Sequence, residues 1–136
     1  MNDEKASTVR ILVVDDEKEI CRIFLKSLSS GGYEAKAVTT GGGAVSLVKQ
    51  TFFNLVFLDI VMPGISGDVV LGNIKEISPD TEVIMMTGSL MSVGLMKELR
   101  KKGASGFLQK PFKLEEILEI IGKKGKKKQN KSLLSG

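Results

Sequence analysis

Four short runs along the chain are mostly apolar, and each ends directly before a polar or charged residue. They are residues 11–14, 55–58, 83–86 and 106–109, rich in Val, Ile, Leu, Met and Phe. Short, nearly continuous apolar runs that alternate with helical patterns are typical of parallel β-strands buried on both faces. The sequence therefore predicts a parallel sheet with helices covering both of its faces.

A further strand and the helices follow from the remaining periodicity. Residues 33–38 alternate apolar side chains with Glu34 and Lys36, which predicts a strand with one wetter side at the edge of the sheet. Apolar residues at three- and four-residue spacing predict amphipathic helices. These helices cover residues 17–29, 40–50, 68–77, 90–102 and 114–121.

Two of the helix starts carry capping residues. We expect a Thr to cap the second helix, which begins at about Thr40, and Ser89 to cap the fourth, which stops at Gly103. Glycines 41–43 follow Thr40 directly, and each costs up to about 1 kcal/mol in a helix. We therefore expect the second helix to start late or to be frayed at its start.

Strand and helix alternate five times along the 136 residues. With right-handed crossovers, this alternation predicts an α/β fold: a doubly wound, five-stranded parallel sheet in the flavodoxin-like order 2-1-3-4-5, with helices on both faces. The length fits one domain with a single core. We divide the chain into a polar lead-in over residues 1–9, a domain over 10–122 and a Lys-rich tail or linker over 123–136.

The positive net charge belongs to the end of the chain. There are 20 Lys and Arg residues against 16 Asp and Glu, but six of the lysines follow Gly122, where no acid occurs. Residues 1–122 therefore carry 14 basic and 16 acidic side chains, a formal charge of −2. The Lys-rich segment has three interpretations: a linker to a further domain, a contact with nucleic acid, or a solvated end. We expect no nucleic-acid binding by the domain itself.

The rarer residue types exclude several kinds of chemistry. The chain contains no His, which excludes a Ser-His or Cys-His catalytic pair, a His-ligated metal site and a phosphohistidine of its own. A single cysteine, Cys21, excludes an intrachain disulfide, fits a reducing compartment and is expected in the core. No apolar stretch approaches the roughly 20 residues of a membrane span, and the first residues do not resemble a signal peptide. We expect a cytoplasmic protein that does not contact the membrane.

Polar side chains stand at the ends of four predicted strands. Asp15 and Asp16 follow the first strand, Asp59 the third, Thr87 the fourth and Lys110 the fifth. The carboxyl ends of parallel strands lie along one edge of a sheet, and ligands bind there at the switch point of the strand order. We therefore expect three carboxylates, a hydroxyl and an ammonium to converge on one crevice.

Converging carboxylates repel one another and raise their own pKa values unless a cation offsets their charge. Oxygen ligands without Cys or His select a hard cation, and carboxylate together with phosphate oxygens suits Mg²⁺. The Lys110 ammonium suits a phosphate oxygen, and the Thr87 hydroxyl can meet another. A carboxylate in these surroundings is prepared to attack phosphorus and become an aspartyl phosphate. Taken singly, an Asp pair could begin a helix and a Lys could lie on the surface; their joint position favours a site.

Four motifs occur in a fixed order along the chain. They are Val13-Val14-Asp15-Asp16, the segment LDIVMPGISG over residues 58–67, Met86-Thr87-Gly88 and Lys110-Pro111-Phe112. Together they resemble the CheY-like receiver domain of two-component response regulators, and the similarity extends over about residues 10–122. Each motif alone is weak evidence, whereas the four at this spacing are strong.

The resemblance implies a role for each matching residue near the metal. Asp59 would accept the phosphoryl group and share in binding Mg²⁺. Asp16 would bind Mg²⁺ directly, Asp15 largely through water, and Val61 through its backbone carbonyl. Val61 and Ser89 would also tune the lifetime of the phosphoryl group, because side chains at these positions lie over it in receivers. An apolar Val61 and a short Ser89 place water poorly, which predicts a long-lived phosphoryl group.

The resemblance also implies how the phosphoryl group is bound and sensed. Lys110 would bind it, with a cis peptide bond to Pro111 helping to aim the side chain. Thr87 would follow the phosphoryl group on activation. Phe107 would then turn inward, without the hydroxyl contact that a Tyr provides.

The implied function is that of a phosphoacceptor in a two-component phosphorelay. The phosphoryl group would come, with Mg²⁺, from a phosphohistidine of a sensor histidine kinase or a histidine phosphotransfer protein. The domain would not be an enzyme: it would catalyse transfer to its own Asp and slow autodephosphorylation only. Phosphorylation would switch the face formed by the fourth helix, fifth strand and fifth helix, which would meet an output domain, a partner or a second copy of the chain.

Two other functions fit an α/β sheet of this kind. A haloacid dehalogenase-like phosphatase also uses an Asp nucleophile, Mg²⁺ and a Lys, but it needs Asp-x-Asp after the first strand, where this chain has Asp15-Asp16-Glu17. Turnover of a generic phosphomonoester would favour it. A flavin-binding module needs a hydroxyl- and Gly-rich loop there, and these carboxylates would repel the FMN phosphate.

Overall fold

The computed structural model describes residues 8–123 of the chain. The predicted polar lead-in over residues 1–9 and the Lys-rich segment over 123–136 therefore lie almost wholly outside the described residues. None of the helices within 8–123 is both long and apolar enough to cross a membrane.

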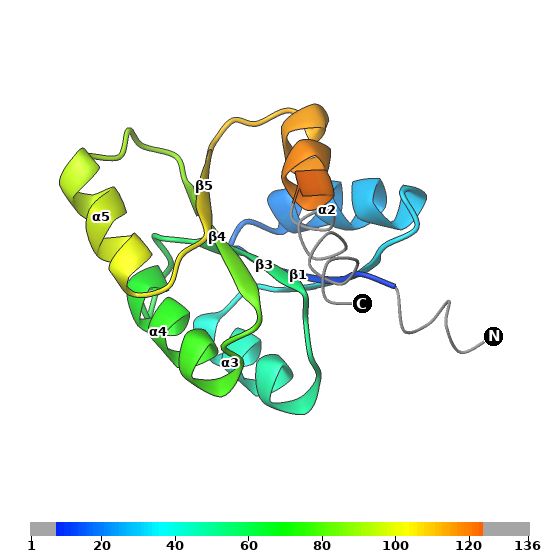
Figure 1. Ribbon diagram of the computed structural model, residues 1–136. Helices are drawn as coiled ribbons and strands as arrows, with labels where there is room; N and C mark the ends of the chain where they lie inside the picture. The colour runs from blue at the N-terminus through cyan, green and yellow to red at the C-terminus, as the bar shows by residue number, and fades with distance from the viewer. Residues whose placement is uncertain (1–7, 124–136) are drawn as a thin grey trace, which may run out of the picture.

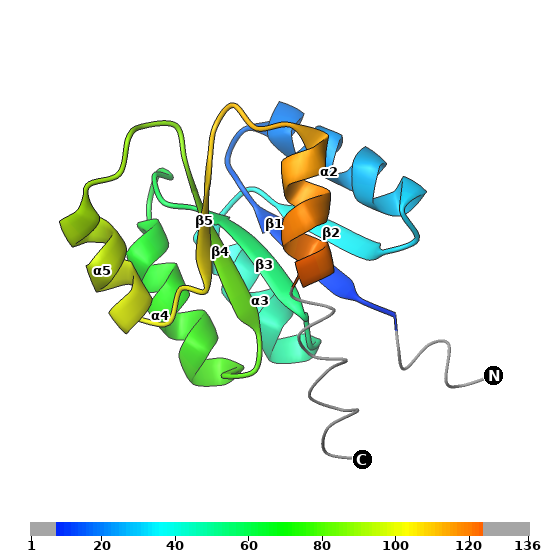
Figure 2. The same cartoon turned by 45° about the horizontal axis from the view of Figure 1, so that its top comes forward.

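Five parallel strands form the centre of the fold. They are β1 (Arg10–Val14), β2 (Glu34–Val38), β3 (Leu55–Asp59), β4 (Glu82–Thr87) and β5 (Gly106–Gln109). Their order across the sheet is β2-β1-β3-β4-β5, and every neighbouring pair is parallel (Figure 2). The predicted flavodoxin-like order is confirmed, and β2 is an edge strand as expected.

Helices cover both faces of the sheet. They are α2 (Lys18–Ser30), α3 (Gly41–Gln50), α4 (Gly67–Ile77), α5 (Val93–Lys101) and a further helix over residues 114–123. Helices α3, α4 and α5 lie on one face, whereas α2 and the 114–123 helix, orange in Figure 1, lie on the other. The layers are thus helix, sheet and helix.

The sheet divides the core into two apolar layers, because successive strand residues point to opposite faces. One layer packs strand residues such as Leu12, Leu58 and Met85 against α3, α4 and α5. The other packs Ile11, Phe57 and their neighbours against α2 and the 114–123 helix. All residues of β3 are buried, which is the two-sided burial that the apolar runs predict.

Helix α3 begins at once after Thr40, so the expected late or frayed start is wrong. The Thr40 Oγ1 atom accepts a hydrogen bond from the Gly43 N–H at 3.0 Å and caps the helix as predicted. Gly41 is buried, and a Cβ atom there would lie 2.6 Å from Val70 Cγ2. Close packing of α3 on α4 thus requires a glycine, and this packing offsets the low helix propensity.

Helix α5 begins one turn later than predicted, and its cap is Ser92 rather than Ser89. The Ser92 Oγ atom accepts from the Leu95 N–H at 3.1 Å. The backbone of Ser89 is instead tied to Thr87, whose hydroxyl accepts from the Ser89 N–H and donates to the Ser89 carbonyl. This local turn keeps Ser89 out of the helix.

The start of α4 lies against the end of β3. The Gly67 N–H donates to the Ile60 carbonyl at 2.9 Å. A Cβ atom at Gly67 would overlap the Asp59 carbonyl oxygen and lie 2.7 Å from Ile60 Cα. Only a residue without a side chain allows this approach, which fixes the backbone just after β3.

We predict that Gly67→Ala lowers the free energy of unfolding by about 1–3 kcal/mol, as overpacking against rigid backbone does. Gly72→Ala, in the same helix but with open space around it, is the matched control. It should raise the free energy of unfolding by up to about 1 kcal/mol through helix propensity. Urea unfolding of both variants tests this, and equal stabilisation by the two would contradict the close approach.

Candidate functional site

The strand register brings three predicted site residues to one edge of the sheet. Val14 of β1 pairs with Leu58 of β3, so the next residues, Asp15 and Asp59, lie side by side. Lys110 follows β5, and its N–H donates to the Thr87 carbonyl at 2.7 Å. This edge lies where the strand order reverses between β1 and β3, the place at which doubly wound folds bind ligands.

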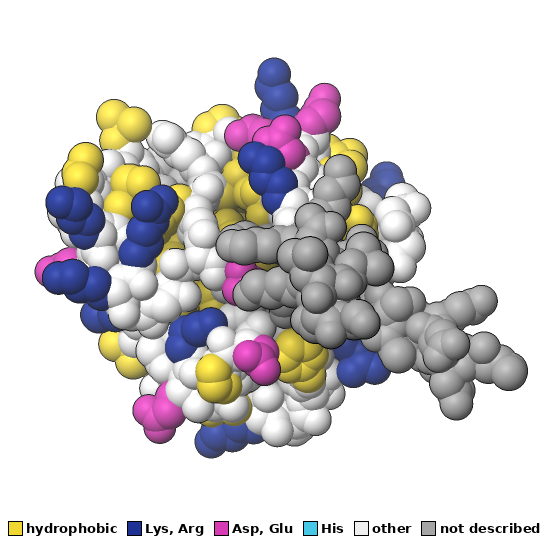
Figure 3. Space-filling view, in the orientation of Figure 1, with side chains coloured by type: hydrophobic (Ala, Val, Ile, Leu, Met, Phe, Trp, Pro, Cys, Tyr) yellow, Lys and Arg dark blue, Asp and Glu magenta, His cyan; other side chains and the backbone are white. Residues whose placement is uncertain are grey.

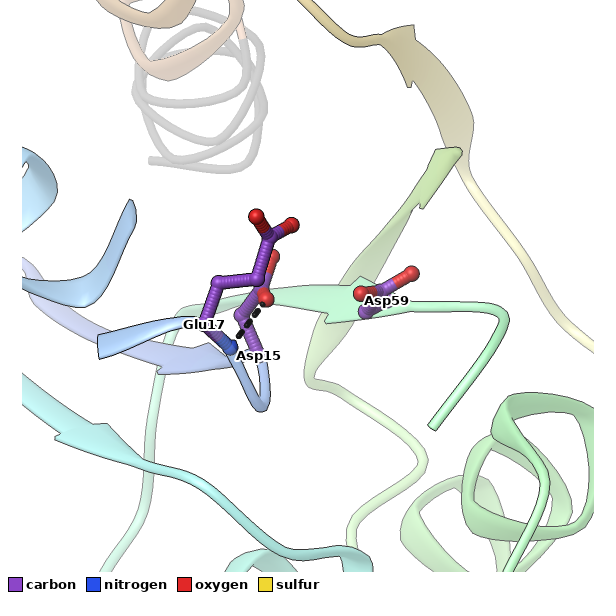
Figure 4. Close-up of side chains that lie close together, drawn as sticks. All are labelled: Asp15, Glu17 and Asp59. Carbon is purple, nitrogen blue, oxygen red and sulfur yellow. Dashed lines mark hydrogen bonds between the residues drawn. The ribbon is translucent and has the colours of Figure 1, made fainter. Parts of the chain in front are cut away.

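The ammonium group of Lys110 lies among three carboxylates. Its Nζ atom is 2.7 Å from Asp15 Oδ2, 3.0 Å from Glu17 Oε1 and 3.1 Å from Asp59 Oδ2. We call Asp15, Glu17 and Asp59 the carboxylate cluster; each offers an oxygen within 4.8 Å of the others. Figure 4 shows the three side chains turned toward one region.

Glu17 is the member of this cluster that the sequence analysis missed. It is the N-cap residue of α2 and has extended dihedral angles, with φ −86° and ψ 109°. Its N–H donates to Asp15 Oδ1 at 2.9 Å, the dashed line in Figure 4. The sequence could have predicted this from the two-residue spacing of Asp15 and Glu17. Alternate residues of an extended segment point to the same side, so Glu17 would lie beside Asp15. Asp16, which was predicted to join the site, is exposed and lies outside the cluster.

One oxygen of Asp15 has no hydrogen bond among the described residues. Asp15 is fully buried, and its Oδ2 atom is close enough to Lys110 for an ion pair but lacks a well-directed hydrogen bond. Asp59 is 5% exposed and is better satisfied, because Oδ1 accepts from the Val61 N–H at 3.2 Å and Oδ2 from Lys110. A buried carboxylate oxygen without a hydrogen bond is suited to a cation or a water molecule.

The cluster shifts the titration of its central groups. Burial raises the pKa of Asp59, and the charge of Asp15 adds to this, whereas the hydrogen bonds from Lys110 and Val61 act in the opposite direction and are outweighed. Burial lowers the pKa of Lys110, but the close contacts of its ammonium with the carboxylates of Asp15, Glu17 and Asp59 outweigh this and raise the pKa overall. The Lys110 ammonium is therefore charged at neutral pH.

The other predicted site residues surround this cluster. The Thr87 hydroxyl is hydrogen-bonded to the backbone of Ser89, and none of the hydrogen bonds found within residues 8–123 joins it to the carboxylate cluster. The Val61 side chain is 75% exposed. Phe107 is half-buried, and the Arg100 guanidinium lies 5.2 Å from its ring centroid, a cation–π contact. The Lys110–Pro111 peptide bond is cis.

Comparison with known proteins agrees with this geometry. A model of the response regulator receiver domain matches residues 11–122. The chain belongs to this family. The matched residues include Asp59 at the end of β3, and Asp15 and Lys110, which directly follow β1 and β5. The phosphatase alternative is not favoured.

Relatives of this receiver domain come from fungi and bacteria. The transcription factor SKN7 of Candida albicans is 33% identical over 113 residues, covering 83% of this chain and 20% of the relative. Response regulator protein FleR of Pseudomonas aeruginosa is 30% identical over 114 residues, covering 84% of this chain and 24% of the relative. Transcriptional regulatory protein DltR of Streptococcus agalactiae is 31% identical over 113 residues, covering 83% of this chain and 50% of the relative. The chain thus spans half or less of the length of these relatives.

Solved structures of single receiver domains match almost end to end. The CheY-like response regulator receiver domain protein from Methanospirillum hungatei JF-1 has a TM-score of 0.86 at 29% identity, covering 91% of this chain and 98% of that one. The signal receiver domain of a putative Luxo repressor protein from Vibrio parahaemolyticus has a TM-score of 0.84 at 28% identity, covering 95% and 98%.

We predict that Asp59→Asn raises the free energy of unfolding of the metal-free protein at pH 7. The pKa of Asp59 is raised in the folded state, so folding favours its neutral form; that contribution is present at low pH and is lost as the pH rises through the folded pKa. Asn removes the charge at every pH. Urea unfolding in EDTA measures the effect.

Glu115→Gln, which removes one charge from an exposed helix position, is the control and should change the free energy of unfolding by less than about 0.5 kcal/mol. A loss of stability in Asp59→Asn would mean that the ion pair with Lys110 outweighs the cost of burial.

Proposed function

We propose that this receiver domain accepts a phosphoryl group on Asp59 from a phosphohistidine, with Mg²⁺, and passes the signal on as a change of shape. The donor is a sensor histidine kinase or a histidine phosphotransfer protein. One observation carries the proposal: the Asp59 carboxylate lies beside a buried Asp15 oxygen that has no hydrogen bond among the described residues and 3.1 Å from the Lys110 ammonium.

The residues present fit a divalent cation. The carboxylate cluster brings three negative charges to one ammonium, and its ligands are all oxygens, which suit Mg²⁺. Asp59, Asp16 and the Val61 carbonyl would bind the ion directly, and Asp15 largely through water. The Asp16 side chain is exposed outside the cluster and would have to turn toward the ion. When bound, the cation would offset the charge of the phosphoryl oxygens.

The proposed transfer moves one phosphoryl group between two residues. A carboxylate oxygen of Asp59 attacks phosphorus, the P–N bond of the phosphohistidine breaks, and its electron pair returns to the imidazole nitrogen. The product is an acyl phosphate on Asp59. Lys110 would bind a phosphoryl oxygen, and its Nζ atom lies 3.1 Å from Asp59 Oδ2, which supports this role. Val61 is apolar and Ser89 is short, so neither of these two side chains is an acid that could orient an attacking water, and we propose slow hydrolysis.

Signalling would follow from the surroundings of Thr87 and Phe107. To meet a phosphoryl group, the Thr87 hydroxyl must leave the Ser89 backbone. Phe107 would occupy the space vacated and leave its contact with Arg100. This changes the face made by α5, β5 and the 114–123 helix.

That face is suited to a partner. Figure 3 shows hydrophobic side chains beside Lys and Arg side chains over α5, at the left of the view. Exposed apolar residues in α5 and just before it include Leu90, Val93 and Leu95. We propose that an output domain, a separate partner or a second copy of the chain binds here. Curated relatives with transcription-factor names are at least twice as long as the aligned segment, which supports an output domain.

We predict that acetyl phosphate with Mg²⁺ adds one phosphoryl mass to the wild type and none to Asp59→Asn. EDTA should abolish the addition, because the cation offsets charge on the phosphoryl oxygens. Intact-mass spectrometry measures it, with Glu115→Gln as a control that should be labelled normally. Labelling of Asp59→Asn at the wild-type level would refute the assignment.

We predict that Thr87→Ala still accepts phosphate but shows little change in amide hydrogen exchange over residues 90–110. Without the hydroxyl, the phosphoryl group cannot draw the loop and Phe107 after it. Thr87→Ser keeps the hydroxyl and should respond as the wild type does. A full wild-type change in amide exchange in the Ala variant would show that the conformational change does not depend on the Thr87 hydroxyl.

A further inference from the structure

Glu17 differs from the other two members of the carboxylate cluster in its exposure. The side chains of Asp15 and Asp59 are 0% and 7% exposed, whereas that of Glu17 is 60% exposed. The Lys110 side chain is 14% exposed, a value between those of the two Asp side chains and that of Glu17. Glu17 therefore meets the ammonium from the solvent side.

The two buried carboxylates are also held more firmly. Asp15 accepts from the Glu17 N–H, and Asp59, the last residue of β3, accepts from the Val61 N–H. The Glu17 carboxylate is bound to Lys110 at 3.0 Å and otherwise faces water. Water can replace Lys110 at an exposed carboxylate with little loss, whereas a buried carboxylate would lose its partner outright.

We propose that Glu17 holds Lys110 in the unphosphorylated protein and competes with the phosphoryl group for its ammonium. This inference rests on the proposed function. An ammonium has three N–H donors, and here three carboxylate oxygens lie within 3.1 Å of it. A phosphoryl group on Asp59 brings new oxygens to Lys110, and Glu17 is the partner that gives way.

A cation at the site would strengthen this role. If Asp15 and Asp59 hold a divalent ion, part of their charge is taken up by that ion and less remains for Lys110. Glu17 then carries the carboxylate least engaged elsewhere. Glu17 is thus a positioning residue: it acts through Lys110 and sets how readily the ammonium reaches a phosphoryl group.

The test uses beryllofluoride, a stable anion that takes the place of a phosphoryl group on an Asp carboxylate. With saturating Mg²⁺, Glu17→Gln should bind beryllofluoride about two- to fivefold more tightly than the wild type, the range for loss of an exposed ion pair. In about 1 M salt, where charges are screened beyond about 3 Å, the gain should shrink. NMR titration of the full chain measures both affinities.

Two controls separate the contact from a general charge effect. Glu19→Gln removes an acid from α2 whose carboxylate lies 3.4 Å from Arg22 instead, and it should leave the affinity unchanged. In a Lys110→Ala background, Glu17→Gln should have no effect, because the competition needs the ammonium. The Lys110 side-chain ammonium NMR signal in the metal-free protein should shift in Glu17→Gln and not in Glu19→Gln.

Several outcomes would overturn the inference. They are unchanged or weaker beryllofluoride binding by Glu17→Gln, a gain that persists without Lys110, and a Mg²⁺ affinity lowered more than about threefold, which would make Glu17 a metal ligand. Failure of the wild type itself to bind beryllofluoride would overturn the proposed function as well. Normal wild-type binding with no effect of Glu17→Gln would overturn this inference alone.

Discussion

The ammonium group of Lys110 stabilises like charges that would otherwise repel one another at the edge of the sheet. Asp15 and Asp59 are buried, so water cannot solvate their carboxylates, and Lys110 Nζ lies 2.7 and 3.1 Å from them. The ion pairs meet only part of this demand, as the hydrogen-bond-free Oδ2 atom of Asp15 shows among the described residues. A bound cation would therefore stabilise these carboxylates further, and together with Lys110 it would attract an anion.

This arrangement depends on the register of the strands. Asp15 lies beside Asp59 because Val14 pairs with Leu58, and a one-residue slip would turn one of the two carboxylates to the opposite face of the sheet. The close approach of Gly67 to the backbone after Asp59 fixes the same strand end from the side of α4. Rigid backbone thus positions the charged groups that a phosphoryl group would meet.

Much of this arrangement could be predicted from the sequence, because it depends on backbone periodicity. Strands buried on both faces appear as apolar runs, and the polar residue after each run marks the carboxyl edge, which places Asp15, Asp59 and Lys110. The predictions that were wrong concern local geometry. Ser89 and Ser92 are equally good caps by type, and only the hydrogen bonds of Thr87 decide between them.

Glu17 was missed for a similar reason. An acid at a helix start has a sufficient explanation in the helix dipole, and its contact with Lys110 joins residues far apart in the sequence. The early start of α3 likewise depends on the neighbouring Val70, which a propensity scale cannot include. Tertiary contacts thus explain each of these departures from the predictions.

The division of the core into two layers has a consequence for how such a domain can diverge. Residues of the α3–α5 layer and of the α2 layer do not interdigitate, because the sheet separates them. Substitutions in different layers should therefore be close to additive in stability. A lineage could remodel one helical face for a new partner while the packing behind the other face stays intact, which makes the two sides of the sheet separable units of evolutionary change.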